Sequence, residues 1–222
     1  MHCSFMFFAG VSLASLSLAL FLQPSSAQND CVNFWVNPTT GEEECFGANT
    51  ELETVGPSQA HPSSKGNLVI NGSFERPRIA NNDWRPLPSI QGWSLSFGPA
   101  IEVKNVDGRP FHGRNFIELD SHASSGIYQD IKTQPGQKYT LSFAVSGRPG
   151  TPAKDNRLLV LWDKKPIQNI QLRPDASGKY AWKQVSVSVT GSSGATTRLE
   201  FQDKGKSNSL GTHLDAVMLM PQ

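Results

Sequence analysis

The sequence predicts an all-β protein, an antiparallel β-sandwich of the jelly-roll type. Short segments alternate apolar and polar residues with the period of two that a half-buried strand requires. Turn residues separate these segments at steady intervals, and no segment shows a helical period. The strand segments are numerous enough to form two packed antiparallel sheets, which is the arrangement of a jelly roll.

The clearest strands are Gly126–Ile131 and Lys138–Val145, separated by Pro135-Gly136. In the second strand, bulky apolar residues alternate with small or polar ones and predict one buried face. The bulky residues are Tyr139, Leu141, Phe143 and Val145. Pro followed by Gly suits a type II turn, because glycine accepts the positive φ of the second central position. We therefore expect a hairpin at this place.

Further strands are expected on both sides of this hairpin. Asn67–Glu75 begins with a short apolar strand, which the turn signal Asn71-Gly72 ends. The other expected strands are Gly92–Phe97, Ile101–Lys104, Asn115–Leu119, Arg157–Trp162, Ile167–Leu172, Trp182–Val189, Thr197–Phe201 and Gly211–Met220. Arg157–Trp162 is apolar at nearly every position, which predicts burial on both of its faces. Ile79–Ile90 is polar and rich in proline, so we expect a long loop there with an exposed Trp84.

The composition describes a globular chain and excludes one class of partner. Of 222 residues, 37% are hydrophobic and 18% are charged. The formal net charge is +1, with 20 Lys and Arg against 19 Asp and Glu. Non-specific binding of nucleic acid requires a basic field, and this sequence has none.

Residues 1–27 are expected to be a secretory signal. Phe5–Leu22 is apolar, and Pro24 and the small-residue site Ser25-x-Ala27 follow it directly. A membrane anchor is the alternative, but the apolar run is near the lower limit of about 17–25 residues for spanning a bilayer. We expect a mature chain without a membrane span, secreted to the extracellular space or the periplasm.

The cysteines support the same compartment. Cys3 belongs to the signal, which leaves Cys31 and Cys45 as a pair in an exported chain, and a disulfide is the default for such a pair. A zinc site or a redox pair is less suited, because no His flanks the two thiols and their spacing is not C-x-x-C. We expect residues 28–50 to form a disulfide-stapled hairpin, residues 51–66 a linker, and residues 67–222 the jelly roll.

Several phrases occur in the order of a known family. They are NLVINGSFE at Asn67–Glu75, GPAIEV at Gly98–Val103, FIELD at Phe116–Asp120, GIYQDI at Gly126–Ile131 and the segment Leu214–Val217. Over about Gly66–Met220 the chain resembles the domain-of-unknown-function 642 family, which includes plant cell-wall proteins and bacterial exported proteins of the "choice-of-anchor" type. That family is similar to the galactose-binding-domain jelly rolls. The resemblance implies a β-sandwich that binds polysaccharide or another wall component, with no established catalytic activity.

The resemblance also implies a structural calcium ion. Its side-chain ligands would be Glu75, after the first strand, and Asp215, at the start of the last strand, together with backbone carbonyls. Calcium takes about 6–8 oxygen ligands, and carboxylates with main-chain oxygens suit it. The alternative is that Glu75 is a solvated loop residue and Asp215 caps a strand end.

A sugar site on a β-sandwich needs aromatic planes for pyranose rings and planar polar groups for their hydroxyls. The candidates are Trp84, Phe111, Tyr128, Gln129 and Arg148. Trp84 and Phe111 lie in polar segments, where an aromatic residue has little structural purpose. Trp93 and Trp162 lie in apolar strands and are expected in the core. The pattern leaves open whether Tyr128 or Gln129 points outward.

These observations favour a secreted, non-catalytic carbohydrate-binding or surface-associated module whose partner is a polysaccharide or a cell-surface glycan. One alternative is a glycan-active hydrolase with a carboxylate pair about 5–10 Å apart. The carboxylates available for it are Glu102, Glu118, Asp130 and Glu200. Another alternative is a purely structural surface protein. The sequence contains no nucleophile elbow, Walker loop or dinucleotide fingerprint.

Overall fold

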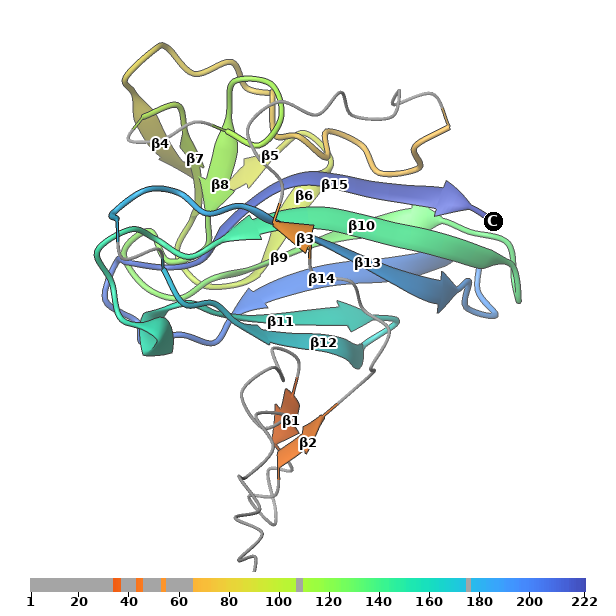
Figure 1. Ribbon diagram of the computed structural model, residues 1–222. Helices are drawn as coiled ribbons and strands as arrows, with labels where there is room; N and C mark the ends of the chain where they lie inside the picture. Colours follow the sequence, from red (N-terminus) through yellow and green to blue (C-terminus); the bar gives the residue numbers. More distant parts are fainter. Residues whose placement is uncertain (1–33, 37–42, 46–52, 55–65, 107–109, 175–176) are drawn as a thin grey trace, which may run out of the picture. The chain divides into compact units, whose positions relative to one another are not determined.

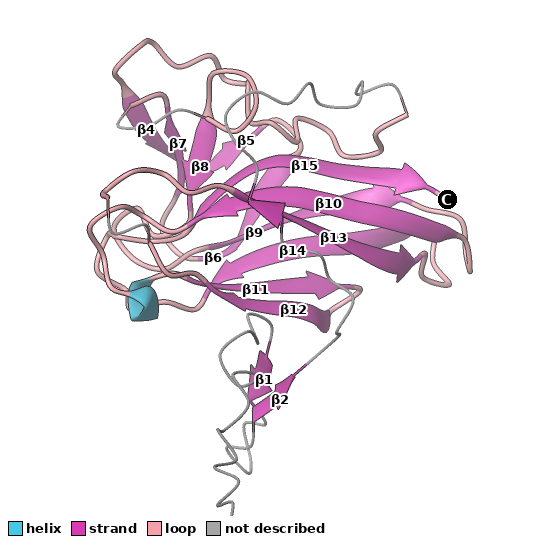
Figure 2. Cartoon of the chain, viewed as in Figure 1, coloured by secondary structure: helices cyan, strands magenta, loops and turns pink. Residues whose placement is uncertain are grey.

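The computed structural model describes residues 34–36, 43–45, 53–54, 66–106, 110–174 and 177–222, and these residues are almost entirely β-strand and connection (Figures 1 and 2). Helix among them is confined to one 3-10 turn, Ala153–Asp155. None of the described residues form a helix long and apolar enough to cross a membrane. The predicted all-β fold is confirmed.

Two antiparallel sheets pack face to face. The seven-stranded sheet has the order β3-β13-β10-β15-β8-β7-β4. Its strands are β3 (Glu53–Thr54), β13 (Lys183–Thr190), β10 (Lys138–Ser146), β15 (His213–Pro221), β8 (Phe116–Glu118), β7 (Ile101–Lys104) and β4 (Trp84–Leu87). The six-stranded sheet has the order β12-β11-β14-β9-β6-β5. Its strands are β12 (Lys165–Gln171), β11 (Arg157–Trp162), β14 (Thr196–Asp203), β9 (Gly126–Lys132), β6 (Trp93–Phe97) and β5 (Ser89–Ile90).

The core lies between the two sheets, because each strand turns its apolar positions inward. Its largest fully buried side chains include Trp93, Phe74, Phe143, Phe201, Ile101, Ile117, Ile127, Leu141 and Leu158. Trp93 and Trp162 are 1% and 5% exposed, as predicted for core residues.

The expected hairpin of Gly126–Ile131 and Lys138–Val145 is wrong. β9 pairs with β14 and β6 in one sheet, whereas β10 pairs with β13 and β15 in the other. The connection therefore crosses the sandwich, and the apolar rows of the two strands face each other through the core. The turn itself has the predicted form, since Gly136 has φ 74 and Gln137 N donates to Gln134 O at 3.1 Å.

The two ends of the domain lie side by side. Leu68 N donates to Leu219 O at 3.0 Å, and Val217 N donates to Gly72 O at 2.9 Å. The short strand expected at the start of Asn67–Glu75 is nevertheless wrong, whereas the expected Asn71-Gly72 turn is present, with Phe74 N donating to Asn71 O at 3.1 Å. The Asn67 side chain replaces a regular ladder there, since its Oδ1 accepts the N–H groups of Val69 and Leu219.

Two further expectations need correction. The segment Ile79–Ile90 contains the short strands β4 and β5, although Trp84 is exposed as predicted. β11 is buried on one face only, because its alternate residues Leu159 and Leu161 lie on the outer side of the six-stranded sheet. β4 and β5 are edge strands, which the sequence pattern does not identify, and an apolar residue on the outer side of a sheet looks the same in the pattern as one in the core.

The predicted signal and Cys31 lie outside the described residues, as does most of the segments 28–50 and 51–66. Within residues 28–50, β1 (Phe34–Val36) and β2 (Glu43–Cys45) form an antiparallel pair in which Phe34 is opposite Cys45. The disulfide stays a prediction.

Candidate functional site

Charged and aromatic side chains collect on the outer face of the seven-stranded sheet, the face turned away from the core. We call this set the outer-face cluster. Its members are Glu102, Lys104, Phe116, Glu118, Arg148, Tyr180, Trp182 and His213.

The strand register explains why these residues meet. Residues directly opposite each other in antiparallel strands share a face. Glu102 is opposite Glu118, and Glu118 is opposite His213, so one row crosses β7, β8 and β15. A second row crosses β4, β7 and β8, in which Lys104 lies between Trp84 and Phe116.

Glu118 is the centre of the charged part. Its side chain is 0% exposed, and Lys104 Nζ lies 2.9 Å from Oε2. Arg148 Nη1 donates to Oε2 at 2.6 Å and to Oε1 at 2.8 Å, and Gly211 N donates to Oε1 at 2.8 Å. His213 Nε2 lies 3.4 Å from Oε2. Both oxygens of this carboxylate are therefore fully engaged.

The surroundings shift the pKa values of the ionisable groups in this cluster in different directions. Burial alone would raise the pKa of Glu118, but His213, Lys104 and Arg148 hold it below its ordinary value. Burial, and then the charge of Glu118, raise the pKa of Glu102. Burial lowers the pKa of His213 against the opposing effect of Glu118. A charged Glu118 between Lys104 and Arg148, beside a neutral His213, is the arrangement that these shifts favour.

Aromatic rings cover the charged row. Tyr180 and Trp182 are stacked, with ring centroids 6.4 Å apart and an interplanar angle of 19°. Phe116 meets both edge-on, at 5.6 and 5.8 Å. Phe111 lies 6.2 Å from Trp182 and is half-buried. Phe116 and Trp182 are themselves buried, whereas Phe111 and Tyr180 are partly buried.

Three of the predicted ligand residues meet on this face. Trp84 is 45% exposed and opposite Lys104, Phe111 packs on Trp182, and Arg148 is held by Glu118. Sequence reasoning missed the contributions of Tyr180 and Trp182. Trp182 was expected only as the first residue of a strand, and Tyr180 was not considered; the signal that could have found them is two aromatic residues close together at the start of that strand.

The other two predicted ligand residues lie elsewhere. Tyr128 is on the outer face of the six-stranded sheet, with the guanidinium of Arg198 3.7 Å from its ring centroid. Arg198 also makes two bonds of 2.8 Å with Asp130. Gln129 points inward and binds the backbone of Ile70 through both N–H and C=O, at 2.7 and 2.9 Å. Gln129 therefore fastens the start of the domain.

Glu75 and Asp215 lie close enough to interact, and both face backbone N–H groups. Glu75 Oε1 accepts the N–H of Arg114 and of Asn115, at 2.7 and 2.9 Å. Asp215 Oδ2 accepts the N–H of His112 at 2.8 Å. Burial raises the pKa of Asp215 well above its ordinary value, with Glu75 adding to the rise. The donors around this pair suit carboxylates but cannot themselves bind a cation.

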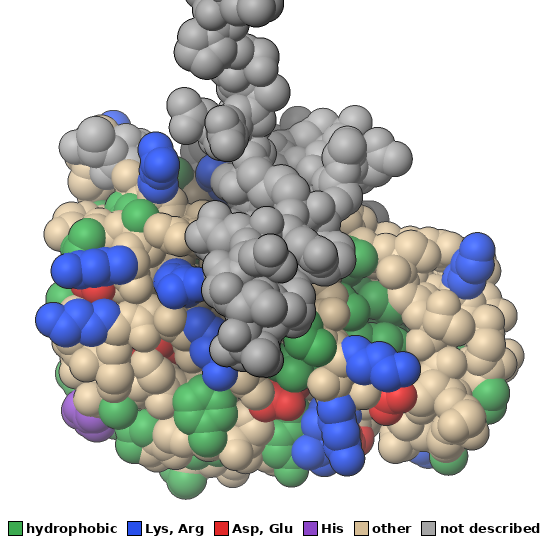
Figure 3. All heavy atoms as spheres, turned by 90° about the horizontal axis from the view of Figure 1, so that it is seen from below, with side chains coloured by type: hydrophobic (Ala, Val, Ile, Leu, Met, Phe, Trp, Pro, Cys, Tyr) green, Lys and Arg blue, Asp and Glu red, His purple; other side chains and the backbone are tan. Residues whose placement is uncertain are grey.

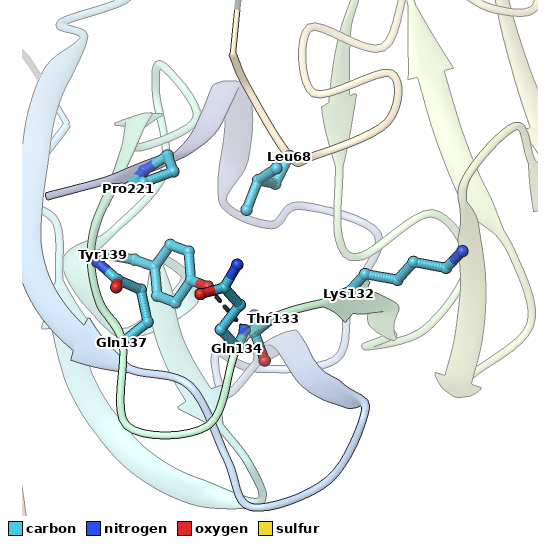
Figure 4. A pocket seen from close by; sticks show the side chains of 7 residues that line it. All are labelled: Leu68, Lys132, Thr133, Gln134, Gln137, Tyr139 and Pro221. Carbon is cyan, nitrogen blue, oxygen red and sulfur yellow. Dashed lines mark hydrogen bonds between the residues drawn. The ribbon is translucent and has the colours of Figure 1, made fainter.

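An open pocket of about 410 Å³ lies at the β9–β10 connection (Figure 4). Its lining residues are Leu68, Lys132, Thr133, Gln134, Gln137, Tyr139 and Pro221. Tyr139 is only 3% exposed, and its hydroxyl accepts the N–H of Gln134 at 2.8 Å. The Gln137 amide donates to Lys138 O and Gln222 O, both at 3.1 Å. Much of the polar lining therefore serves the fold.

The remaining charges are dispersed. Figure 3 shows the described part of one face, where Lys and Arg lie among acidic and hydrophobic side chains and form no single basic patch. Asp130 and Glu200, two of the carboxylates considered for a hydrolase, belong to the six-stranded sheet, whereas Glu102 and Glu118 belong to the seven-stranded one.

The sequence model of a family described as "Protein of unknown function (DUF642)" matches residues 67–220. The chain belongs to this family. The DUF642 domain thus coincides with the sandwich from Asn67 to Met220, and the predicted family is confirmed. The plant protein TEEBE of Arabidopsis thaliana is 33% identical over 127 residues, which are 49% of this chain and 33% of that protein. The matched part therefore spans about a third of this plant relative.

Solved structures with a similar fold include a cyclase from Fischerella sp. TAU. Its TM-score is 0.50 at 16% identity, and the match covers 69% of the DUF642 chain and 95% of the cyclase. TmCBM61, solved in complex with beta-1,4-galactotriose, matches with a TM-score of 0.48 at 13% identity and covers 70% of this chain and 99% of that one. The first match supports the jelly-roll fold, and neither transfers a ligand to this protein.

Proposed function

We propose that this DUF642 domain is a non-catalytic carbohydrate-binding module that acts outside the cell and binds a polysaccharide or cell-surface glycan on the outer face of the seven-stranded sheet. The observation that carries the proposal is the position of Arg148. It is held by Glu118 and lies near Tyr180, on the face that exposes Trp84.

The chemistry of this face suits a sugar. Aromatic planes bury the apolar C–H faces of a pyranose ring, and a guanidinium presents five N–H donors in a fixed plane to hydroxyl oxygens. The side chain of Arg148 is 27% exposed and uses Nη1 on Glu118, so its other donors can serve a ligand. Because Glu118 fixes the guanidinium beforehand, binding loses less side-chain entropy.

Trp84 extends the same surface. Strands are spaced about 4.8 Å apart, so Trp84 on β4 lies two strands, or about 10 Å, from the β8 strand that carries Glu118. A ligand that stacks on Trp84 and bonds to Arg148 therefore has to be longer than one ring, which favours a polysaccharide chain.

Export, the Cys31–Cys45 disulfide and a structural calcium belong to the same proposal. The apolar segment and small-residue site of residues 1–27 support export, and export supports the disulfide. A calcium ion at Glu75 and Asp215 would have to displace N–H groups from their oxygens, including that of Ala216 at 2.6 Å from Asp215 Oδ1.

A hydrolase is the second candidate function, and one observation favours it. Glu102 and Glu118 are opposite each other with pKa values shifted in opposite directions, as in an acid and base pair. However, Glu118 is 0% exposed and both of its oxygens are engaged by cations and an N–H group. A nucleophile or base has to reach the substrate, so this geometry favours binding.

The test is retention on insoluble cellulose, xylan, pectin and β-1,4-galactan, with a binding isotherm for any that retains the protein. Trp84→Ala and Arg148→Ala should each weaken binding about tenfold, because stacking and a charge-assisted bond contribute about 1–3 kcal/mol each. Phe97→Ala is the matched control, because Phe97 is 38% exposed but lies on the other sheet.

Three outcomes contradict the proposal. No retention on any glycan removes the binding function. Unchanged binding by Trp84→Ala and Arg148→Ala, with loss in Lys132→Ala and Gln134→Ala, places the ligand in the pocket of Figure 4 instead. Release of soluble sugar by the wild type, abolished in Glu102→Gln, establishes a hydrolase.

A further inference from the structure

Four polar side chains come together from loops at the end of the sandwich that carries the 3-10 turn (Figure 2). Asp120 follows β8, Asp155 closes the 3-10 turn, Asp203 ends β14, and Asn208 lies between β14 and β15. None of these residues was part of the predicted metal site, and none belongs to the outer-face cluster.

Hydrogen bonds join them into one group. Asn208 N donates to Asp120 Oδ2 at 2.9 Å, and Asn208 Nδ2 donates to Asp155 Oδ2 at 3.0 Å. Asp203 Oδ2 accepts the hydroxyl of Ser124 at 2.7 Å, and Ser124 is the bridge partner of Asp120. Each carboxylate therefore has one oxygen occupied.

The other oxygen of each carboxylate is buried without a partner. Asp120, Asp155 and Asp203 are 0%, 3% and 2% exposed. Their Oδ1 atoms, and Oδ1 of Asn208, accept no hydrogen bond from any described residue. A buried polar atom without a partner costs about 1–3 kcal/mol, and a buried charge costs more.

Charge is also unbalanced here. Among the described residues, none of the ion pairs includes Asp120, Asp155 or Asp203. Three buried carboxylates, each with one oxygen that accepts no hydrogen bond from a described residue, are an environment that a bound cation stabilises.

We infer that Asp120, Asp155 and Asn208, with Asp203 beside them, form a site for a divalent cation, and that calcium is the ion that fits. Among the described residues, no group of three His, Cys, Asp or Glu side chains could hold a metal ion by itself, so the amide oxygen of Asn208 would have to act as a ligand beside the carboxylates. Carboxylate and amide oxygens from irregular loops are ligands of Ca²⁺, which completes about 6–8 positions with water and carbonyls, whereas structural Zn²⁺ sites favour Cys and His.

This site differs from the one implied at Glu75 and Asp215. There the carboxylates accept backbone N–H groups, whereas here Oδ1 of each of the four side chains accepts no hydrogen bond from a described residue. The ion would tie the loops after β8, before β11 and after β14 together. The last of these loops also supplies Gly211, whose N–H binds Glu118, so the ion would order one border of the outer-face cluster.

Calcium binding to the metal-free protein, measured by isothermal titration calorimetry, tests the site. Asp155→Asn keeps the shape and removes one charge, and it should lower the calcium affinity at least about tenfold, because affinity follows the number of charged ligands. Glu75→Gln is the matched control at the other carboxylate pair and should leave this binding event unchanged. Calcium should also raise the melting temperature of wild type and Glu75→Gln, but not of Asp155→Asn.

The opposite pattern overturns the inference. If the wild type binds no calcium, or if Asp155→Asn binds it with the same affinity, the proposed site does not exist. If only Glu75→Gln loses binding, the calcium ion binds at Glu75 and Asp215 instead. If Asp155→Asn does not fold, Asn208→Ala takes its place, and a crystal structure grown with calcium decides directly. If the electron density between the four Oδ1 atoms fits a water molecule and not a calcium ion, ordered water satisfies these oxygens and the inference is wrong.

Discussion

Replacing Glu118 with Gln should destabilise the domain far more than the removal of any surface charge. The substitution keeps the size of the side chain and one acceptor oxygen but removes the negative charge. Lys104 and Arg148 then remain beside a neutral amide, with side chains that are 3% and 27% exposed. Neither cation can move fully into water. Lys104 retains Glu102 at 3.4 Å, whereas Arg148 loses the carboxylate that holds it, so the loss is chiefly the cost of leaving a partly buried cation without Glu118.

The magnitude follows from the contacts. Glu118 is 0% exposed and lies 2.9 Å from Lys104 Nζ and 2.6 Å from Arg148 Nη1. Removing one partner of a buried ion pair costs about 3–5 kcal/mol. In a domain of this size, each kcal/mol lowers the melting temperature by about 2–4 °C, so we expect a fall of roughly 6–20 °C.

The control is an ion pair of similar geometry on the surface. Asp130 and Arg198 are 2.8 Å apart, with side chains 43% and 35% exposed. Exposed pairs contribute about 0–1 kcal/mol, so Asp130→Asn should lower the melting temperature by no more than about 4 °C. Calorimetric melting of wild type and both variants measures the difference.

The pH dependence gives a second readout of the same reasoning. Because the pKa of Glu118 is lowered in the fold, its contribution is present above the unfolded value of about 4.5 and is lost as the pH falls below it. Glu118→Gln should therefore flatten the acid side of the stability curve. Equal melting of Glu118→Gln and Asp130→Asn, or an unchanged acid limb, would refute the role given to Glu118.

Three further predictions concern single contacts. Gly72→Ala should strongly lower the melting temperature, because its new Cβ would overlap Val217 O, whereas Gly194→Ala, with 3.5 Å to the nearest atom, should not. Gln129→Ala should speed amide hydrogen exchange at Ile70 and cost about 1–3 kcal/mol in urea unfolding, since two backbone bonds are lost. Burial raises the pKa of Asp203 to about 6 in the folded protein, so the fold favours the protonated carboxyl. Without divalent cation, the free energy of unfolding should therefore fall as the pH rises from about 4 to about 6. Asp203→Asn should remove this fall.

Alternation was sufficient to predict the faces of most strands. The expected bounds of β7 and β11 are those of the structure, and β6, β9, β10, β13, β14 and β15 differ from expectation by two residues or fewer at either end. Alternation did not predict sheet partners. The alternation in β9 and β10 fits a hairpin within one sheet, and it fits equally well a connection between the two sheets. In both arrangements the apolar residues of the two strands are buried in the same core.

The site was predicted where an aromatic or charged residue had no structural reason to be present, as at Trp84 and Phe111. Site residues were missed where their proximity depends on how the strands pair. Lys104 and His213 become neighbours of Glu118 only through the registers of β7–β8 and β8–β15, which join positions far apart in the chain. Gln129 was predicted to bind a ligand but binds the backbone of Ile70 instead. The sequence pattern does not show this partner, because it is 59 residues away.

Stability alone does not explain the buried charges of the outer-face cluster. A buried ion pair often stabilises a fold no more than apolar residues of the same volume do, and the core between the sheets is already well filled by Phe, Ile and Leu. A local departure from the apolar rule is expected where a protein binds something. We therefore expect the combined change Lys104→Met, Glu118→Leu and Arg148→Met to preserve or raise the melting temperature while abolishing glycan retention. A triple variant that unfolds would instead assign the cluster to the fold, because its charges would then be needed without any ligand.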